Sequence, residues 1–440
     1  MKPSCLHVTV AGITAMAILA VGSLTSCLTL YPYYQEDAGQ NGDAKYPAPD
    51  AGQGYDSVPV DFGAPIQDGA PVEVDANIPA CPRPLAAADR PRKLVISHPY
   101  TEARASSGTI EVFDLSTNGD LLAADTPFQL DQVNQGRIVF TPDGEIGMVA
   151  HEDGSIGVFR FTAGVAPTVI HQKFTGSFYA TTLTISDDGQ KVYVVDSNWR
   201  NNGGGIYELA IGCDGTLMEL GLVAPSKLAQ AMVWLHQTPN RAVVAAYDLL
   251  DSPIDQSTHL LDLAGDPTLL SSVNGFGDNE SILSDLAVTY DDQFVLVGDN
   301  SGFSNVANRV AVGKVQGNNL ITQPLITPIK DPTSILASPF NNAALVISGF
   351  SDAAFRLSYD PLASPAFVNE GELSYKGASP QLPSVAVMVD RGTLKGRVWV
   401  AENVGIRQLR FNADGTISDL GLFPLGKGYD KIVGAIGVQP

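Results

Sequence analysis

A short apolar segment repeats along most of the chain, and this repeat limits the fold more than any other feature. Each copy is a run of aliphatic and β-branched residues bounded by Gly, Pro or Asp, which favours a strand over a helix. Copies recur about 45–55 residues apart, a period typical of repeat architectures. The seven copies lie at Leu94–Ser97, Met148–Ala150, Lys191–Asp196, Val243–Ala246, Phe294–Val297, Leu345–Ser348 and Val398–Ala401.

One complete unit shows what surrounds the repeated strand. A first strand and turn (Leu183–Gly189) precede the copy Lys191–Asp196, and a third strand (Gly205–Leu209) follows after a polar loop. The turn Cys213–Gly215 then leads into a fourth strand, Thr216–Leu220. Asp-Gly turns between short apolar runs are hairpin signals, so the unit is predicted to be a four-stranded antiparallel meander. Helical spacing competes with this interpretation only over Ser226–His236.

The two ends of the repeat region complement each other. The copy at Leu94 has no first strand before it, whereas Ile432–Pro440 alternates like a first strand and has no second strand after it. A ring explains both observations, because the C-terminal strand can complete the unit that begins at Leu94 and leave no open sheet edge there. We therefore expect residues 81–440 to form one ring-shaped domain.

The unit resembles those of the YVTN or lactonase-type seven-bladed β-propellers. Asp188–Val194 matches their "DG-x-x-x-Y-V" core, and Asp414–Ile417 matches their "DG-x-L" outer hairpin. The resemblance covers about residues 91–440 and implies an all-β, seven-bladed propeller of four-stranded antiparallel blades. It leaves the chemistry open, because that superfamily holds lactonases, binding proteins and members of unknown role.

No linear motif adds a reaction to this fold. The chain lacks G-x-S-x-G, H-E-x-x-H, G-x-G-x-x-G, C-x-x-C, a P-loop and an EF-hand-type acidic loop. The catalytic residues of lactonase-type propellers carry no linear motif and cannot be mapped onto this chain one by one. Catalytic residues and metal ligands are accordingly left unassigned.

The N-terminal segment has the features of an export signal. An apolar run from Val8 to Leu24 is short and diluted for a membrane span. It ends in Leu24-Thr25-Ser26-Cys27, which resembles the lipobox of bacterial lipoproteins. The resemblance implies that residues 1–26 are cleaved and that Cys27 carries diacylglycerol, usually with a further acyl chain such as palmitate. Leu28 after the cysteine favours the outer membrane of the cell envelope. An ordinary signal peptide with a chance cysteine is the alternative.

Residues 28–80 form an acidic segment rich in Gly and Pro. They carry nine Asp and Glu against Lys45 alone, with no lasting apolar periodicity, and together with Cys27 they are predicted to be a lipidated, disordered stalk. The remaining 360 residues hold 24 Lys and Arg against 38 Asp and Glu. This balance excludes nucleic acid as a partner, because phosphate binding needs clustered basic residues. The expected partners are the lipid membrane, through the acyl chains, and a protein, glycan or small molecule.

Two cysteines remain after export and lipidation. Cys5 leaves with the signal peptide and Cys27 takes lipid, so Cys81 and Cys213 stay in the domain. An even pair in an oxidising compartment is a candidate disulfide. Two separate buried thiols are the alternative.

Polar residues occupy one equivalent position at the end of the repeated strand. The position holds His98, His151, Asp196, Tyr247, Asp299, Gly349 and Glu402. If these side chains ring a channel mouth, they can bind a polar ligand or a divalent cation, since imidazole with carboxylate suits zinc and carboxylates with carbonyls suit calcium. Trp199 and Arg200, in the loop after Asp196, could stack on and pair with an anionic ring compound. The alternatives are strand capping for the ring and a packing lid for Trp199.

Two functions follow from these observations. The preferred prediction is a membrane-tethered propeller that binds a protein, glycan or small ligand at this loop face without catalysis. The alternative is a lactonase-like hydrolase that uses the acidic and histidine residues of the same face.

Overall fold

A computed structural model describes residues 81–440 apart from 131, 152, 163–164, 173–178, 198–203, 227, 252–255, 278–280 and 301–308. The predicted signal peptide, Cys27 and stalk lie outside the described residues, as do Trp199 and Arg200. Within the described part the chain is all-β, and its helical elements are two 3₁₀ turns, η3 (Leu249–Asp251) and η5 (Tyr429–Lys431). The stretch where helical spacing competes holds a strand.

Five sheets of four antiparallel strands make up most of the molecule, and in each the strands follow one another in chain order. They are β9 (Ala180–Ile185), β10 (Lys191–Asp196), β11 (Gly205–Ile211) and β12 (Leu217–Pro225); β13 (Ala231–Trp234), β14 (Arg241–Ala245), β15 (Thr258–Asp262) and β16 (Thr268–Val273); β17 (Leu283–Val288), β18 (Phe294–Asp299), β19 (Arg309–Gln316) and β20 (Asn319–Ile326); β21 (Pro332–Ala337), β22 (Ala343–Ser348), β23 (Ala353–Tyr359) and β24 (Phe367–Glu372); and β25 (Ala386–Met388), β26 (Arg397–Glu402), β27 (Gly405–Phe411) and β28 (Ile417–Pro424). The predicted four-stranded meander is confirmed.

The other strands form one nine-stranded sheet that brings the two ends of the domain together. It contains β1 (Lys93–Tyr100), β2 (Ser106–Leu115), β3 (Leu121–Ala124), β4 (Phe128–Gln129), β5 (Asn134–Phe140), β6 (Ile146–His151), β7 (Ile156–Thr162), β8 (Val165–Gln172) and β29 (Ala435–Val438). The C-terminal strand β29 pairs antiparallel with β1, as the sequence predicts, with Leu94 opposite Val438. It also pairs in parallel with β5, with Ala435 opposite Gly136. This second pairing, which the sequence does not indicate, joins two four-stranded sets into one sheet.

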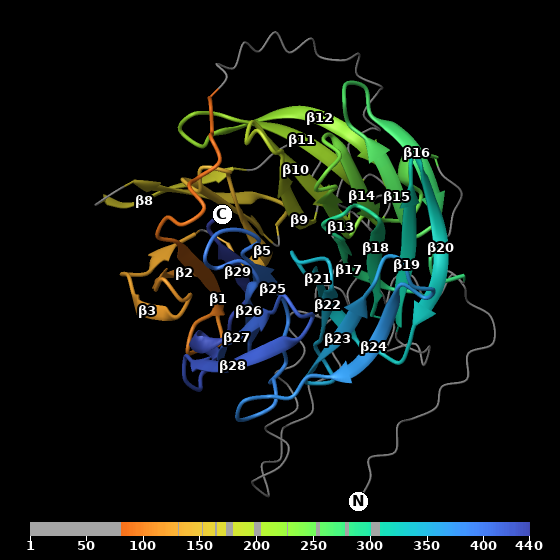
Figure 1. Ribbon diagram of the computed structural model, residues 1–440. Coiled ribbons are helices and arrows are strands. Elements are labelled where there is room, and N and C mark those ends of the chain that lie inside the picture. The colour runs from red at the N-terminus through yellow and green to blue at the C-terminus, as the bar shows by residue number, and fades with distance from the viewer. Residues whose placement is uncertain are drawn as a thin grey trace, which may run out of the picture.

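The sheets stand around a common centre, with the first strand of each innermost (Figure 1). Successive first strands contact one another in the order β5, β9, β13, β17, β21, β25 and β29, and β29 contacts β5. Apolar clusters fill the space between neighbouring sheets; Met148 of β6 packs with Val192 of β10, and Leu94 of β1 with Trp399 of β26. Second strands such as β6, β18, β22 and β26 are buried along their whole length. Both of their faces are covered, which explains their unbroken apolar sequences.

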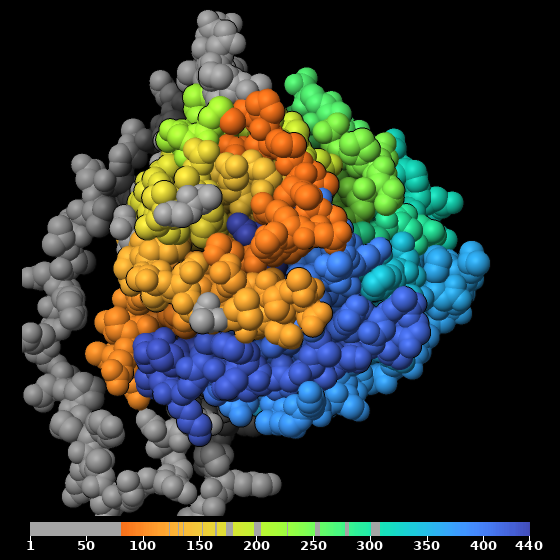
Figure 2. Space-filling view, turned by 60° about the vertical axis from the view of Figure 1, so that its left-hand side comes forward, coloured from red at the N-terminus to blue at the C-terminus, as the bar shows by residue number. Residues whose placement is uncertain are grey.

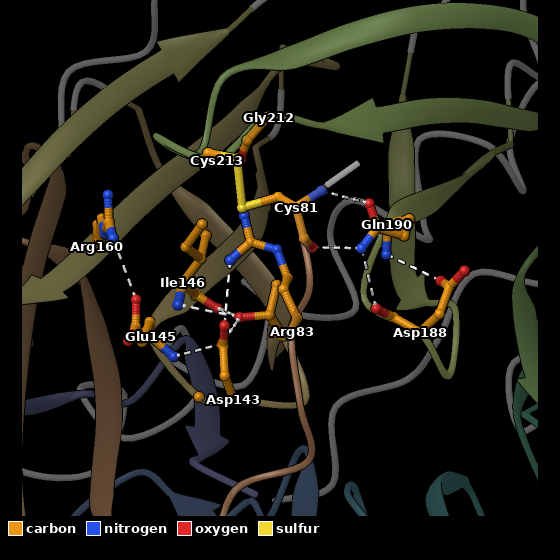
Figure 3. A network of polar contacts seen from close by, with 12 residues as sticks. Cys81, Arg83, Asp143, Glu145, Ile146, Arg160, Asp188, Gln190, Gly212 and Cys213 are labelled. Carbon is orange, nitrogen blue, oxygen red and sulfur yellow. Dashed lines mark hydrogen bonds and ion pairs between the residues drawn. A yellow bond between two sulfur atoms is a disulfide. The ribbon is translucent and has the colours of Figure 1, made fainter. Parts of the chain in front are cut away.

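The segment ahead of β1 is fixed to the turns of two neighbouring units. Cys81 forms a disulfide with Cys213, in the turn between β11 and β12 (Figure 3). The backbone N–H of Cys81 donates to Gln190 Oε1 at 3.1 Å. Arg83 donates to the carbonyl of Gly212 at 2.7 Å and forms an ion pair with Asp143 at 3.3 Å. The segment is therefore held against the end of the strands where each first strand turns into the second.

The C-terminus lies beside this same segment. In Figure 2 the last residues, in dark blue, are enclosed by the orange and yellow residues of the start of the domain. Gln439 accepts a hydrogen bond from the Lys93 backbone at 3.0 Å and donates from its amide to the Gly144 carbonyl at 2.7 Å. Arg92 donates to the Gln439 carbonyl at 2.9 Å. Polar contacts thus support the pairing of β29 on both sides.

Candidate functional site

A cavity of about 190 Å³ lies at the centre of the molecule, where the first strands begin. Every first strand from β5 to β29 contributes lining residues, either from the strand or from the residues just ahead of it. Small residues (Gly136, Ala231 and Gly434) leave room at the centre, and larger polar side chains project from the wall. Concave sites with a few convergent polar groups are the usual form of a small-molecule site.

An ion pair crosses the centre at the cavity wall. Arg137 of β5 meets Asp285 of β17 in a two-pronged contact, with nitrogen to oxygen distances of 2.9 and 2.5 Å. The guanidinium also donates to Ser334 Oγ at 2.8 Å and to the Ala386 carbonyl at 3.1 Å. Asp285 additionally accepts the Ile335 backbone N–H at 2.9 Å. The pair therefore ties four sheets together and carries no net charge.

Two other polar groups at the cavity have no such contacts. Ser284 Oγ and Asn300 Oδ1 are buried, and within the described part of the chain neither has a hydrogen-bond partner. The neighbouring hydroxyls differ, because Thr181 donates to the Val195 carbonyl at 3.1 Å and Thr333 to the Ile347 carbonyl at 3.3 Å. Both oxygen atoms are closed off by the surrounding protein, and Ser284 Oγ packs against Gly298 of β18, where an added Cβ would lie 2.5 Å from it.

The predicted ring residues lie at this same end of the strands but do not line the cavity. Asp196, Asp299 and Glu402 are buried, and each accepts a backbone N–H from the segment that leads into the first strand of its own sheet. The donors are Tyr179 at 2.8 Å, Ile282 at 3.0 Å and Gln381 at 3.1 Å. These are the contacts of strand capping, the alternative interpretation. A ligand role for these carboxylates stays a prediction.

Glu402 also belongs to an ion-pair network. Burial raises the pKa of its carboxyl above the ordinary value, while the ion pair with Arg407 and the Gln381 N–H act in the opposite direction. Arg407, itself buried, also binds Asp419 at 2.7 Å. The carboxylate of Glu402 is thus part of a buried charge network inside its own sheet.

The other members of the ring also contact their local surroundings. His98 lies 3.0 Å from the Ile432 carbonyl and 2.9 Å from Glu111 Oε2. His151 is buried, with its ring 5.2 Å from that of His171. The Tyr247 hydroxyl donates to the Ser281 carbonyl, and the Gly349 N–H donates to the Asp331 carbonyl. Each of these residues is thus held by its own surroundings, and a shared ligand site for them stays a prediction.

The described residues contain neither a candidate metal site nor a candidate membrane-spanning helix. Across residues 81–440 with the gaps given above, no set of three or more His, Cys, Asp and Glu side chains is arranged to hold a metal ion. The same residues include no helix of the length and apolarity needed to cross a bilayer. The cation and the membrane anchor stay predictions.

The cavity residues were missed in the sequence because their signal is weak. Arg137 and Asp285 are the single charged residues of their first strands, Asn134–Phe140 and Leu283–Val288. A charge within a buried strand is a recognisable anomaly. The two residues are 148 positions apart, however, and nothing in the sequence pairs them.

The comparisons with known proteins concern the fold. No protein-family model and no curated protein matches the chain. Among solved structures, the periplasmic gluconolactonase of Pseudomonas aeruginosa is 15% identical, with a TM-score of 0.58 over 80% of this chain and 99% of that one. A protein proposed to be a 6-phosphogluconolactonase, from Bacteroides uniformis, is 13% identical, with a TM-score of 0.58 over 79% and 99%. The chain has the fold of a lactonase-type β-propeller.

A third likeness shows how widely this fold is shared. A hypothetical selenium-binding protein from Sulfolobus tokodaii is 11% identical, with a TM-score of 0.60 over 80% of this propeller and 94% of that chain. The resemblance of the repeat unit to lactonase-type propellers is therefore confirmed for the fold. At these identities the likeness does not extend to activity.

Proposed function

We propose that this propeller binds a small polar molecule in its central cavity. The observation that carries the proposal is the cavity of about 190 Å³ where the first strands converge, with the Arg137–Asp285 ion pair at its wall. The wall contains both apolar and polar side chains, as small-molecule sites do.

We further propose that the ring is closed and seven-bladed, with β29 as the innermost strand of the blade that begins at β1. The pairings of β29 with β1 and β5 support this, as do the contacts between successive first strands. A closed ring gives the cavity a rigid wall, because no sheet edge is free to move away from the centre.

The site is tested with the full-length protein purified in detergent and screened against small polar molecules by thermal shift. Asn300→Ala and Gln230→Ala, at two polar residues that line the cavity, should reduce the shift given by any ligand found. Asn318→Ala is the matched control, because Asn318 is an exposed asparagine that binds Arg241 on a distant hairpin. If a ligand gives the same thermal shift with both cavity variants as with the wild type, it binds elsewhere and the proposal is refuted.

Membrane anchoring through Cys27 is a separate part of the proposed function. It is supported by the lipobox-like sequence and by the acidic segment 28–80, which can hold the domain clear of a lipid surface. In a bacterial host, Cys27→Ser should move the protein from the membrane fraction to the soluble fraction and abolish labelling by palmitate. Retention of Cys27→Ser in the membrane fraction would show that lipidation of this residue is not the anchor.

A lactonase-like hydrolase is the second candidate, favoured by the fold likeness to a gluconolactonase over 99% of that chain. Here Asp285 is the carboxylate at the cavity, while His151 and Glu402 are the predicted acid and base groups. Acid release from glucono-δ-lactone above the buffer rate, lost in Asp285→Asn, would favour hydrolysis. If acid is released no faster than in buffer alone, the hydrolase is refuted and the protein binds without catalysing hydrolysis.

A further inference from the structure

We infer that the Cys81–Cys213 disulfide is a reversible redox latch for the last strand, β29, and through it for one wall of the central cavity. Reduction of this bond by an external dithiol loosens β29, and reoxidation fixes the strand again. The inference goes beyond the proposed function, because it needs no bound ligand. It is carried by the contacts of residues 81–92, which we call the strap, with the turns of three sheets.

The strap begins at the sheet that contains β9–β12. Cys81 is bonded to Cys213, in the turn between β11 and β12, and donates its N–H to Gln190 Oε1 at 3.1 Å (Figure 3). Arg83 donates to the Gly212 carbonyl at 2.7 Å. Neither β1 nor β29 belongs to this sheet. The disulfide therefore ties the strap covalently to a sheet other than the one in which the chain ends meet.

The middle of the strap crosses the turns of two further sheets. Arg90 packs on the turn between β5 and β6, since a Cβ at Gly144 would lie 1.7 Å from Arg90 Nη2. Asp89 accepts the N–H of Thr393, between β25 and β26, at 2.7 Å. The strap thus lies across the turns on both sides of the sheet position that β29 occupies.

The end of the strap holds β29, and β29 in turn reaches the cavity. Arg92 is buried and donates to the Gln439 carbonyl at 2.9 Å. The Lys93 N–H donates to Gln439 Oε1 and the Gln439 N–H to the Lys93 carbonyl, both at 3.0 Å. Ahead of the strand, Gly434 lines the central cavity and donates its N–H to the Ser97 carbonyl at 2.9 Å. One short strand therefore connects the strap to the cavity wall.

The latch is open to reaction from the solvent. Cys213 is exposed, so a thiolate of an external dithiol can attack its Sγ and displace the Cys81 sulfur. The second thiol of the reductant then displaces Cys213, and the dithiol leaves as its own disulfide. Its two electrons and two protons end on the two cysteines. Arg83, whose guanidinium binds beside Cys213, favours the thiolate form that reacts in both directions.

Reduction changes what holds the strap. Without the disulfide, the start of the strap keeps the hydrogen bond of Cys81 with Gln190 and the contacts of Arg83 with Gly212 and Asp143. Such noncovalent contacts open and close repeatedly in a folded protein, whereas a covalent bond does not. Local detachment of the strap therefore becomes possible, and β29 loses the support of Arg92.

The test is hydrogen–deuterium exchange of the full-length protein in detergent, with and without dithiothreitol. Thiol titration first measures the expected gain of two thiols per chain under native conditions. The peptide that covers Gly434–Gln439 should exchange roughly tenfold faster after reduction, while the peptide that covers β18 should be unchanged. Reoxidation should restore the original rate.

Variants separate the latch from a general loss of stability. The double variant Cys81→Ser with Cys213→Ser should exchange at the reduced rate and not respond to dithiothreitol. Arg92→Met keeps the disulfide but removes a contact between strap and β29, so its β29 peptide should exchange fast even when oxidised; Gln439→Ala serves the same purpose if Arg92→Met does not fold. The matched control Arg241→Met, at the start of β14, should behave like the wild type.

Three results would overturn the inference. Thiols that appear only in denaturant would show that the bond is closed to exchange in the folded protein. An unchanged rate at Gly434–Gln439 after reduction would show that β29 is held without the latch. Equal acceleration in β29 and β18 would reduce the effect to a lower global stability. The proposed ligand site is tested separately and survives each of these results.

Discussion

At the scale of single residues, Asp285 is the side chain on which most contacts at the centre depend. Its carboxylate binds Arg137 from β5 together with the Ser334 hydroxyl and the Ile335 backbone N–H from β21. Its side chain is 8% exposed. Removing it leaves a guanidinium and a backbone N–H without their acceptor.

Asp285→Ala is accordingly predicted to destabilise the protein by about 3 kcal/mol, in the range for breaking a buried ion pair from one side. Urea unfolding measures the change in the free energy of unfolding. The double variant Arg137→Met with Asp285→Leu is the comparison, because it removes both charges and should recover much of the loss. An equal loss in single and double variants would contradict this explanation.

His259 gives the domain a pH dependence. Its imidazole is fully buried between Ser272 Oγ at 2.8 Å and the Ala246 carbonyl at 3.2 Å. Burial lowers the pKa of this imidazole to about 4, although its hydrogen bond to Ala246 acts in the opposite direction. In the unfolded chain the pKa of histidine is about 6.5. Between these values the unfolded chain takes up a proton that the folded protein does not, so stability falls as the pH falls.

We predict that this residue alone lowers the free energy of unfolding of the wild type by about 3 kcal/mol as the pH falls from about 6.5 to 4. His259→Gln has no such proton to bind. The difference in free energy of unfolding between wild type and variant should therefore shift by about this amount over that range, in favour of the variant. Denaturant titrations at a series of pH values measure it, and parallel curves for the two proteins would refute the role of His259.

At the scale of elements, the disulfide connects the segment before β1 to a distant unit. Cys81 and Cys213 are 132 residues apart, so the bond closes a long loop in the unfolded chain. In the chain-entropy model a loop of this length corresponds to about 4–5 kcal/mol of stability. The contacts of Arg83 with Asp143 and Gly212 hold the same segment in the folded protein.

Replacing both cysteines by serine should lower the free energy of unfolding by about 4–5 kcal/mol under oxidising conditions. Reducing agent should have a similar effect on the wild type and none on the double variant. The measurement is denaturant unfolding with and without dithiothreitol. A wild type that is insensitive to reductant while its thiols become titratable would overturn this prediction.

At the scale of the whole molecule, the join between the chain ends depends on the close approach of β29 to β5. A Cβ at Gly437 would lie 2.3 Å from the Ile138 carbonyl oxygen, so only glycine fits this position without a backbone shift. The strand that joins β1 to β5 is also the last strand of the described residues. A defect here therefore affects the sheets on both sides of it.

Gly437→Ala is predicted to destabilise the protein by about 1–3 kcal/mol, the usual cost of overpacking. The matched control is Gly313→Ala in β19, where a Cβ meets its nearest neighbours at an ordinary 3.9 Å. That substitution should be neutral or stabilise by up to about 1 kcal/mol, since alanine has less backbone freedom to lose on folding. Thermal unfolding measures the stability of both variants. An equal loss of stability at the two glycines would contradict the close approach of β29 to β5.

The sequence by itself determined the strands, their grouping by four and the partner of the last strand. The second strands are readable because both of their faces are covered, which requires unbroken apolar runs such as Phe294–Val297. The sequence also placed the polar ring residues at the correct end of the strands. It could not place the cavity, because which side chains reach the centre depends on how the first strands converge. Only the tertiary structure brings Arg137 to Asp285 and places both at the wall of the cavity, since this contact joins residues that are close in space but far apart in the chain.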